Sequence, residues 1–352
     1  MRRPARGPRV AIAQFAPVLG DVDANLERHR EAVARAAGEQ VDLLVFPELS
    51  LTGYRLKDAV PEVARRRDGK TFAELAALSS QVTLLVGLVE ESPEHHFYNA
   101  AALFDGGRLL AVHRKVYLPT YGMFDEQRYF ARGKRVRAVD ARHGRLAVLL
   151  CEDMLHSSAA LIAALDGAAF ILVPSASPAR GIVGDGQLDA NGRHWEAYNR
   201  VMARNLGAYV VYANRVGVED GYTFWGGSEI VGPQGETLAK AAYYDEDWIV
   251  AVLPEEAVRR RRIQNPILRD EDIDLTINEL MRLRQRPRER ASDERSRRGA
   301  RSAAKQRSAS GEQQSGRGGG TAGPPPRYRP MAGETRPRPV EAEQALGDDG
   351  DE

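Results

Sequence analysis

Short apolar runs alternate with longer amphipathic segments along the first two thirds of the chain. The apolar runs predict buried β-strands, and the amphipathic segments predict α-helices. Asp23 and Asn25 are the predicted caps of the first helix. The predicted strands are 10–15, 41–46, 82–89, 100–104, 108–112, 146–150, 169–173 and 209–213, and the predicted helices are 24–37, 71–79, 157–165 and 195–206. This alternation predicts an α/β layered domain.

Three of the predicted strands are followed by a chemically reactive residue. Glu48 follows the strand at 41–46, Lys115 follows the strand at 108–112, and the single cysteine, Cys151, follows the strand at 146–150. In α/β folds the functional groups gather at the carboxyl ends of strands. Taken alone, a cysteine in an apolar context is typical of inert packing, and a charged strand end is typical of solvated surface. The coincidence of all three predicts a catalytic site.

Three motifs around these residues resemble those of the nitrilase superfamily of carbon–nitrogen hydrolases. They are Phe46-Pro47-Glu48-Leu49, Arg114-Lys115-Val116-Tyr117-Leu118-Pro119 and Leu150-Cys151-Glu152-Asp153, and the resemblance extends over residues 9–253. It implies a four-layer αββα sandwich. The segment 118–130 looks most like the glutaminase domain of glutamine-dependent NAD synthetases and its stand-alone relatives. Glu152 after the cysteine is similar to amidases and glutaminases, whereas Met154-Leu155-His156 departs from the aromatic residue that those glutaminase domains often carry.

The resemblance implies a Glu48, Lys115 and Cys151 triad. Cys151 would attack an amide carbonyl to form a thioester, which divides one difficult step into two easier ones. Glu48 would carry the proton. Lys115 would stabilise the oxyanion together with a backbone N–H near Glu152. A free thiol has a pKa of about 8.5, so we expect a nearby cation or base to favour the thiolate.

Further site residues follow from the resemblance. Glu126 would orient Lys115, although a surface carboxylate is the alternative. Tyr121 would form a wall of the active site or only pack. Ser175 and Ser177 are candidate substrate contacts or parts of a plain turn. Composition, rather than the resemblance, suggests that the Gly- and Asp-rich loop 181–192 folds over the site as a lid.

Composition narrows the function classes. The chain has 352 residues, 43% of them hydrophobic, and a formal net charge of +1, which gives no whole-chain signal for nucleic-acid binding. No apolar stretch reaches the roughly 18 residues that a membrane span needs. One cysteine allows no internal disulfide, as expected for the cytoplasm. Neither paired metal ligands nor a phosphate-binding glycine motif occurs, so no metal and no organic cofactor is expected.

The predicted organisation is a flexible N-terminus over 1–8, a hydrolase domain over 9–285 and a disordered low-complexity tail over 286–352. The tail contains Val340 and Leu346 as its only aliphatic residues apart from alanine, too few for a core. Helical patterns at 255–262 and 271–284 connect domain and tail.

The sequence favours a cysteine amidohydrolase that releases ammonia from a small carboxamide. One alternative is a glutaminase subunit that supplies ammonia to a separate synthetase, because no segment resembles an ATP-binding synthetase domain. Another is a catalytically silent assembly scaffold, although no triad member is lost. The resemblance also implies a homodimer or a larger homo-oligomer.

Overall fold

The computed structural model describes residues 7–179 and 190–286. Its internal contacts divide the chain into one compact unit over residues 1–271 and a second over 272–352. The predicted tail beyond Arg286, the first residues of the predicted N-terminal segment and the predicted lid up to residue 189 lie outside the described residues.

Six strands form the first sheet of the larger unit: β1 (Arg9–Gln14), β2 (Leu43–Val45), β3 (Thr83–Glu91), β4 (Phe97–Asp105), β5 (Arg108–Arg114) and β14 (Asp247–Val252). Their order is β14-β1-β2-β3-β4-β5. β2 is parallel to β1 and β3, and the other neighbours are antiparallel. β2 and β5 therefore run in the same direction, so their carboxyl ends meet at one edge of the sheet.

Six further strands form the second sheet: β6 (Ala138–Ala141), β7 (Gly144–Val148), β8 (Phe170–Ser175), β9 (Tyr209–Asn214), β12 (Glu229–Val231) and β13 (Thr237–Lys240). Their order is β13-β12-β9-β8-β7-β6, with β7, β8 and β9 parallel. A separate hairpin pairs β10 (Val216–Glu219) with β11 (Tyr222–Trp225).

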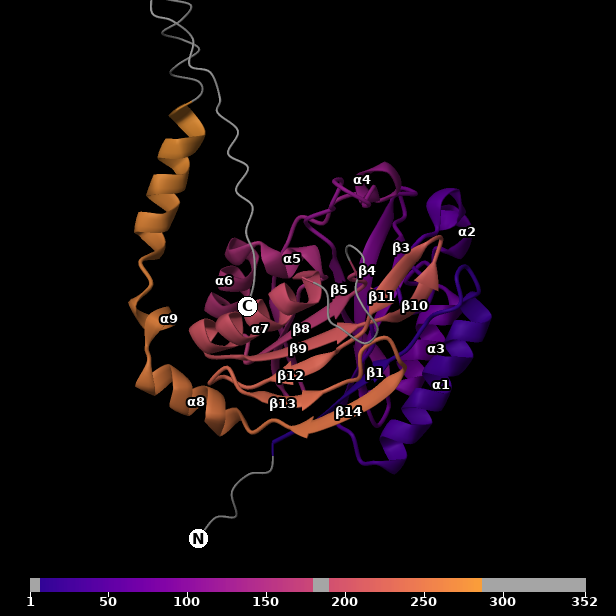
Figure 1. Ribbon diagram of the computed structural model, residues 1–352, viewed down its shortest axis with the longest axis horizontal. Coiled ribbons are helices and arrows are strands. Elements are labelled where there is room, and N and C mark those ends of the chain that lie inside the picture. Colours follow the sequence, from indigo (N-terminus) through magenta and orange to yellow (C-terminus); the bar gives the residue numbers. More distant parts are fainter. Residues whose placement is uncertain (1–6, 180–189, 287–352) are drawn as a thin grey trace, which may run out of the picture. The chain divides into compact units, whose positions relative to one another are not determined.

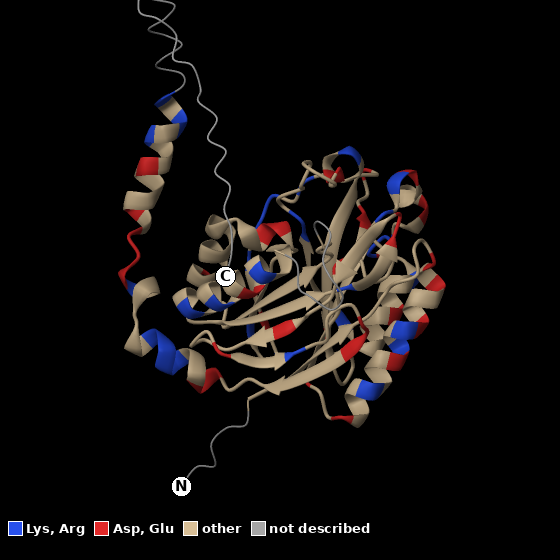
Figure 2. Ribbon diagram, in the orientation of Figure 1, with Lys and Arg blue, Asp and Glu red and all other residues tan. Residues whose placement is uncertain are grey.

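Helices cover the outer face of each sheet (Figure 1). The helices are α1 (Val22–Gly38), α2 (Val60–Val63), α3 (Lys70–Leu78), α4 (Glu126–Tyr129), α5 (Glu152–Leu155), α6 (Ser157–Leu165), α7 (Ala190–Leu206), α8 (Glu255–Gln264) and α9 (Ile267–Asp270), together with the 3-10 turn η1 (Lys57–Ala59). Most charged residues lie on helices and loops, whereas the central strands contain few (Figure 2).

Alternation of side chains along the strands builds three buried layers. Ile12 of β1 packs with Val211 of β9 in the core between the sheets. The neighbouring Ala11 faces the opposite way, toward the core beneath α1 and α3. A third core joins Ile171 of β8 to Ala163 of α6. Since successive strand residues point to opposite faces, both sheets are buried on two sides. The predicted α/β four-layer αββα sandwich is confirmed.

The structure corrects the start of the first helix. Asp21, rather than Asp23, caps α1 by accepting a hydrogen bond from the Ala24 N–H at 2.9 Å. Asn25 lies inside the helix and is fully buried. Its Oδ1 accepts a hydrogen bond from the Val18 N–H, and its Nδ2 donates one to the Val18 carbonyl oxygen. The helix therefore begins two residues before its predicted start.

The smaller unit is described only over residues 272–286, where a helix occupies 273–286. Its apolar side chains Ile273, Ile277 and Leu280 recur at the predicted helical spacing and are exposed.

Candidate active site

Each predicted triad residue lies within three residues of the end of a strand. Glu48 follows β2 and Lys115 follows β5 at one edge of the first sheet, and Cys151 follows β7 in the second sheet. Their relative exposures are 0%, 1% and 8%, respectively. The predicted strand-end positions are confirmed, and the three residues are withdrawn from bulk water.

Lys115 lies between two carboxylates. Its Nζ atom is 2.7 Å from Oε1 of Glu48 and 2.7 Å from Oε1 of Glu126. Burial alone would lower the pKa of Lys115, but the charges of Glu126 and Glu48 outweigh it and hold that pKa well above its ordinary value. The lysine is therefore a fixed cation at neutral pH.

Two hydrogen bonds, one from a side chain and one from the backbone, hold Glu48 in place. Asn99 Nδ2 donates to Oε1 of Glu48 at 2.7 Å, and the Ala176 N–H donates to Oε2 at 2.8 Å. Ala176 follows β8 of the second sheet, so its hydrogen bond connects that sheet to the Glu48 carboxylate, which follows β2 of the first sheet. Neither hydrogen bond was predicted from the sequence, although Asn99 lies within the region that resembles the family.

Gly87 of β3 makes room for the turn that carries Glu48. A Cβ atom at this position would lie 2.4 Å from the Pro47 carbonyl oxygen and 2.5 Å from the Leu49 nitrogen. Glycine is thus required here by close approach of two backbone segments.

Glu126 is buried at 4% exposure, which excludes the alternative of a surface carboxylate. Its Oε1 atom accepts a 2.6 Å hydrogen bond from the Tyr54 hydroxyl as well as the contact from Lys115. Burial raises the pKa of Glu126 to about 7, against the opposing charge of Lys115. The Tyr54 contact was not predicted, because the residues are 72 positions apart.

Cys151 has a strained backbone, with φ of 45° and ψ of −102°. A positive φ is uncommon for a residue other than glycine and typical of functional turns. Lys115 favours the thiolate as expected, but the net shift of the thiol pKa is upward. Burial and the charge of Glu48 raise the pKa of Cys151 well above its ordinary value, and Lys115 offsets only part of this. The thiol is therefore protonated at neutral pH and needs a base for attack.

The remaining predicted site residues occupy different surroundings. The Tyr121 hydroxyl contacts both carboxylate oxygens of Glu152, at 3.1 and 2.9 Å, at the exposed side of the turn after Cys151. Ser175 and Ser177 are buried beside Ala176. Ser177 Oγ accepts from Asn191 Nδ2 at 3.0 Å, and the Ser177 N–H donates to Asn214 Oδ1 at 2.9 Å. These contacts position the turn after β8.

Within the described residues there is no group of three or more His, Cys, Asp or Glu side chains that could hold a metal ion. The same residues contain no helix that is long and apolar enough to cross a membrane.

Comparison with known proteins identifies the family. The model of the carbon–nitrogen hydrolase family matches residues 9–263, most of the larger unit. The chain therefore belongs to the carbon–nitrogen hydrolases, the nitrilase superfamily.

Individual proteins of the family resemble this chain in sequence or in structure. The chain is 34% identical over 250 residues to the glutamine-dependent NAD(+) synthetase of Thermotoga maritima, which covers 70% of this chain and 42% of that protein. A carbon–nitrogen hydrolase from Helicobacter pylori G27 has a TM-score of 0.70 and 27% identity, covering 78% of this chain and 98% of the other. An amidase variant from Nesterenkonia sp. AN1, with the acetamide moiety of fluoroacetamide attached to its active-site cysteine, has a TM-score of 0.65 and 25% identity, with coverages of 79% and 98%. The chain thus spans less than half the length of the NAD synthetase.

Proposed function

We propose that this chain is a glutaminase, which hydrolyses the side-chain amide of glutamine and supplies ammonia to a synthetase. The buried Glu48, Lys115 and Glu126 cluster beside Cys151 carries the proposal, since it provides a base, a cation and a nucleophile. The likeness to glutamine-dependent NAD synthetases supports glutamine over other amides. The matched region is under half the length of those relatives, so the synthetase that would use the ammonia is itself part of the proposal.

In the proposed first half-reaction, Glu48 takes the proton from Cys151 as the sulfur attacks the amide carbon. The protonated resting thiol makes this base necessary. Lys115, held as a cation by two carboxylates, stabilises the oxyanion with the Glu152 backbone N–H. Glu48 then passes the proton to the leaving nitrogen, the carbon–nitrogen bond of the tetrahedral intermediate breaks, and ammonia departs while the thioester forms.

In the second half-reaction, Glu48 takes a proton from water, which attacks the thioester carbon. The carbon–sulfur bond breaks, the thiol of Cys151 regains the proton, and the carboxylic acid product leaves. Glu126 and its Tyr54 hydrogen bond keep the Lys115 amine fixed during both steps. These reaction steps need no metal and no organic cofactor.

A small-amide amidase is the second candidate. It is supported by the Nesterenkonia amidase, which matches this chain over nearly its whole length and forms a covalent adduct at its cysteine. A silent scaffold is disfavoured, because Glu48, Lys115 and Cys151 are all present and buried together.

Ammonia release across a substrate panel tests the proposal. The panel contains glutamine, asparagine, other ω-amides, N-carbamoyl amines and simple nitriles, and Cys151→Ser serves as the blank. We expect turnover of glutamine above the other compounds. Turnover of another amide with glutamine inert would favour the amidase. No release from any compound, with Cys151 unreactive toward iodoacetamide, would contradict both hydrolase functions.

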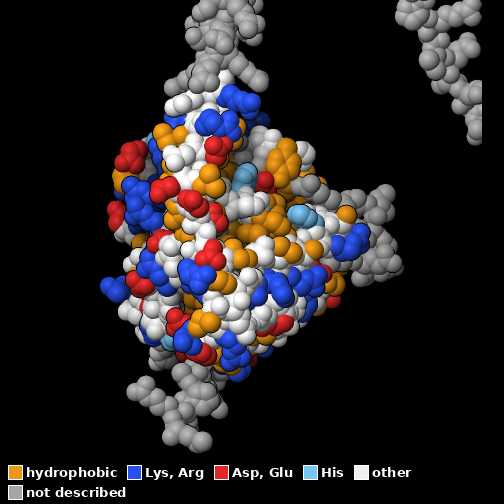
Figure 3. Space-filling view, turned by 90° about the vertical axis from the view of Figure 1, so that its left-hand side faces the viewer, with side chains coloured by type: hydrophobic (Ala, Val, Ile, Leu, Met, Phe, Trp, Pro, Cys, Tyr) orange, Lys and Arg blue, Asp and Glu red, His pale blue; other side chains and the backbone are white. Residues whose placement is uncertain are grey.

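We also propose a homodimer or larger assembly that uses the helical face of the second sheet. Ile162 of α6 and Val201 of α7 are 49% and 52% exposed. The side of the molecule that carries α6 to α9 shows apolar side chains between charged ones (Figure 3). The cytoplasmic location remains a prediction from the single cysteine.

A further inference from the structure

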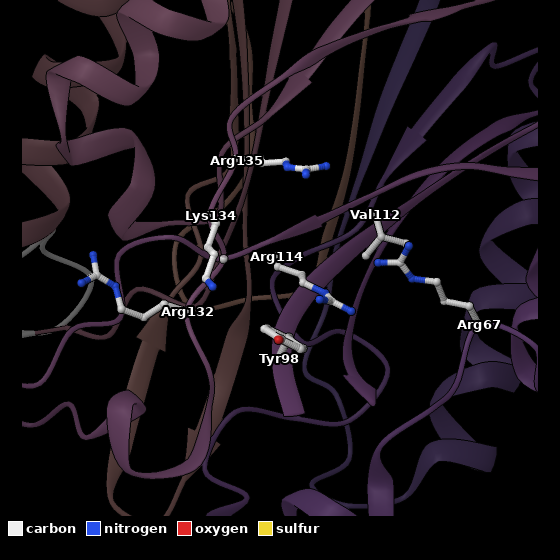
Figure 4. Close-up of a pocket in the computed structure, with 8 residues that line it drawn as sticks. Arg67, Tyr98, Val112, Arg114, Arg132, Lys134 and Arg135 are labelled. Atoms are coloured by element: carbon white, nitrogen blue, oxygen red, sulfur yellow. The ribbon is translucent and has the colours of Figure 1, made fainter. Parts of the chain in front are cut away.

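A second concave site lies against β5, apart from the catalytic turns. Its cavity has a volume of about 480 Å³, and its lining includes Arg67, Tyr98, Arg114, Lys134 and Arg135. Figure 4 shows Arg67 on one side of this cavity, Lys134 and Arg135 on the other, and Arg114 with Tyr98 between them. None of the proposed catalytic residues lines it.

Neighbouring residues separate the two sites. Arg114 and Lys115 are consecutive, and successive side chains of an extended strand point to opposite faces. Arg114 contacts Glu90 and the ring of Tyr98, whereas Lys115 contacts the carboxylates of the active site. An occupant of the basic cavity would therefore not compete with the amide substrate for space.

The basic cavity has more positive than negative charge. Arg114 donates to both oxygens of the buried Glu90, at 2.6 and 2.9 Å, and Arg67 shares the same carboxylate. Lys134 and Arg135 are exposed and make no hydrogen bond or ion pair with any residue that the structure describes. Arg132 also lines the cavity, so five basic side chains lie around one carboxylate, an arrangement that attracts an anion.

The loop that carries Lys134 and Arg135 is held rigidly against β5. The Gly133 N–H donates to the Lys115 carbonyl oxygen at 2.7 Å. A Cβ atom at Gly133 would lie 1.9 Å from the Arg114 carbonyl oxygen, so only glycine allows this approach. Arg114 is fixed in turn by its guanidinium, which lies 3.7 Å from the centre of the Tyr98 ring. The Arg114 guanidinium and the backbone of this loop are therefore in place before a ligand arrives, which lowers the entropic cost of binding.

We propose that this basic cavity binds a small phosphorylated compound of the size of a nucleoside diphosphate. Guanidinium groups match phosphate oxygens in bidentate geometry, and a lysine ammonium adds a mobile donor. A volume of about 480 Å³ lies in the range of small-molecule sites. The cations come from three separate segments and surround a hollow, whereas a nucleic acid would require an extended basic stripe.

Isothermal titration calorimetry of the full chain at low salt tests this proposal with ADP, AMP, inorganic diphosphate, inorganic phosphate and adenosine. We expect ADP and diphosphate to bind and adenosine not to bind. The double variant Lys134→Gln/Arg135→Gln should weaken ADP binding by about tenfold or more, because it removes two charge-assisted donors. These residues have no partner in the described protein, so their replacement should leave folding intact. The matched control is Arg259→Gln/Arg260→Gln, which removes the same charge from the exposed face of α8 and should bind ADP as the wild type does.

The outcomes distinguish a nucleotide ligand from a site that recognises phosphate groups alone. ADP bound more tightly than inorganic diphosphate supports a nucleotide, and equal affinities support a site for the phosphate groups alone. Equal weakening in both double variants, or no heat with any phosphate compound, would overturn the proposal. The titration needs no turnover, so its result is independent of whether glutamine is the substrate.

Discussion

The Nε2 atom of His113 lies 2.7 Å from Oδ2 of Asp153, and this contact joins the strand before Lys115 to the turn after Cys151. Both side chains are buried, at 8% and 0% exposure. The other oxygen of Asp153 accepts hydrogen bonds from the N–H groups of Val116 and Tyr117, at 2.9 and 2.8 Å. A single carboxylate thus fixes the position of the lysine turn relative to the cysteine turn.

Asp153→Asn should lower the rate of ammonia release by about 100-fold, because a displacement of about 1 Å between reacting groups can cost that much. The amide replaces one acceptor oxygen with a donor that faces existing N–H groups, which should also destabilise the fold by about 1–3 kcal/mol. Steady-state kinetics and urea unfolding measure the two effects. Asp140→Asn is the control, since Asp140 is 82% exposed and pairs with Arg145. Equal kinetics in the two variants would contradict the positioning role.

Glu126→Gln should lower the pKa of the Cys151 thiol. The negative charge of Glu126 is one of the causes that raise the pKa of Cys151, after burial and Glu48, so its removal favours the thiolate. Iodoacetamide alkylation measured across neutral and alkaline pH should therefore reach its half-maximal rate at lower pH. Ammonia release should nevertheless fall by about 100-fold, because Lys115 loses one of the two carboxylates that orient it.

Tyr54→Phe is the matched control for that experiment. It removes the hydrogen bond to Glu126 and keeps the charge, so the alkylation profile at alkaline pH should stay that of the wild type. A profile of Glu126→Gln that is unchanged, or moved to higher pH, would show that the carboxylate does not act on the thiol.

The sequence predicted the parts of this site that depend on local pattern. Glu48, Lys115 and Cys151 follow apolar runs that must end where the chain leaves the core, so their strand-end positions could be read directly. The resemblance added the role of Glu126. Short strands were missed, because a segment such as Glu229–Val231 is too brief for a periodic pattern.

Contacts between distant segments were also missed. Tyr54, in the loop before η1, and Glu126, the first residue of α4, are 72 positions apart and meet only in the folded chain. The raised pKa of Cys151 likewise depends on burial, which arises when both sheets are packed. Neither property is encoded by the residues next to the functional group in sequence.

Gly87→Ala should reduce activity by displacing the Glu48 turn. The added methyl group would lie 2.4 Å from the Pro47 carbonyl oxygen, so one backbone segment must move. A shift of several tenths of an ångström to 1 Å would lower ammonia release by about 10-fold to 100-fold. Gly38→Ala tests whether this effect is local, because a Cβ atom there meets nothing within 4 Å. Wild-type rates in both variants would show that β3 does not set the position of Glu48.

The free energy of unfolding should fall as the pH is lowered from about 7 to about 5, because His29 resists protonation in the folded protein. This residue is fully buried, with Nδ1 2.7 Å from the Asn25 carbonyl oxygen and Nε2 3.0 Å from Ser50 Oγ. Burial lowers the pKa of His29 from 6.5 to about 4, so the unfolded chain takes up a proton first and is favoured by acid. The contribution of His29 to the free energy of unfolding is fully present above pH 6.5 and is smaller by about 2 kcal/mol at pH 5. Urea unfolding at both pH values measures the decrease. His29→Gln should remove it. The control His95→Gln, which alters a 74% exposed side chain, should show the same decrease as the wild type. An equal decrease in wild type and His29→Gln would assign the acid sensitivity to other groups.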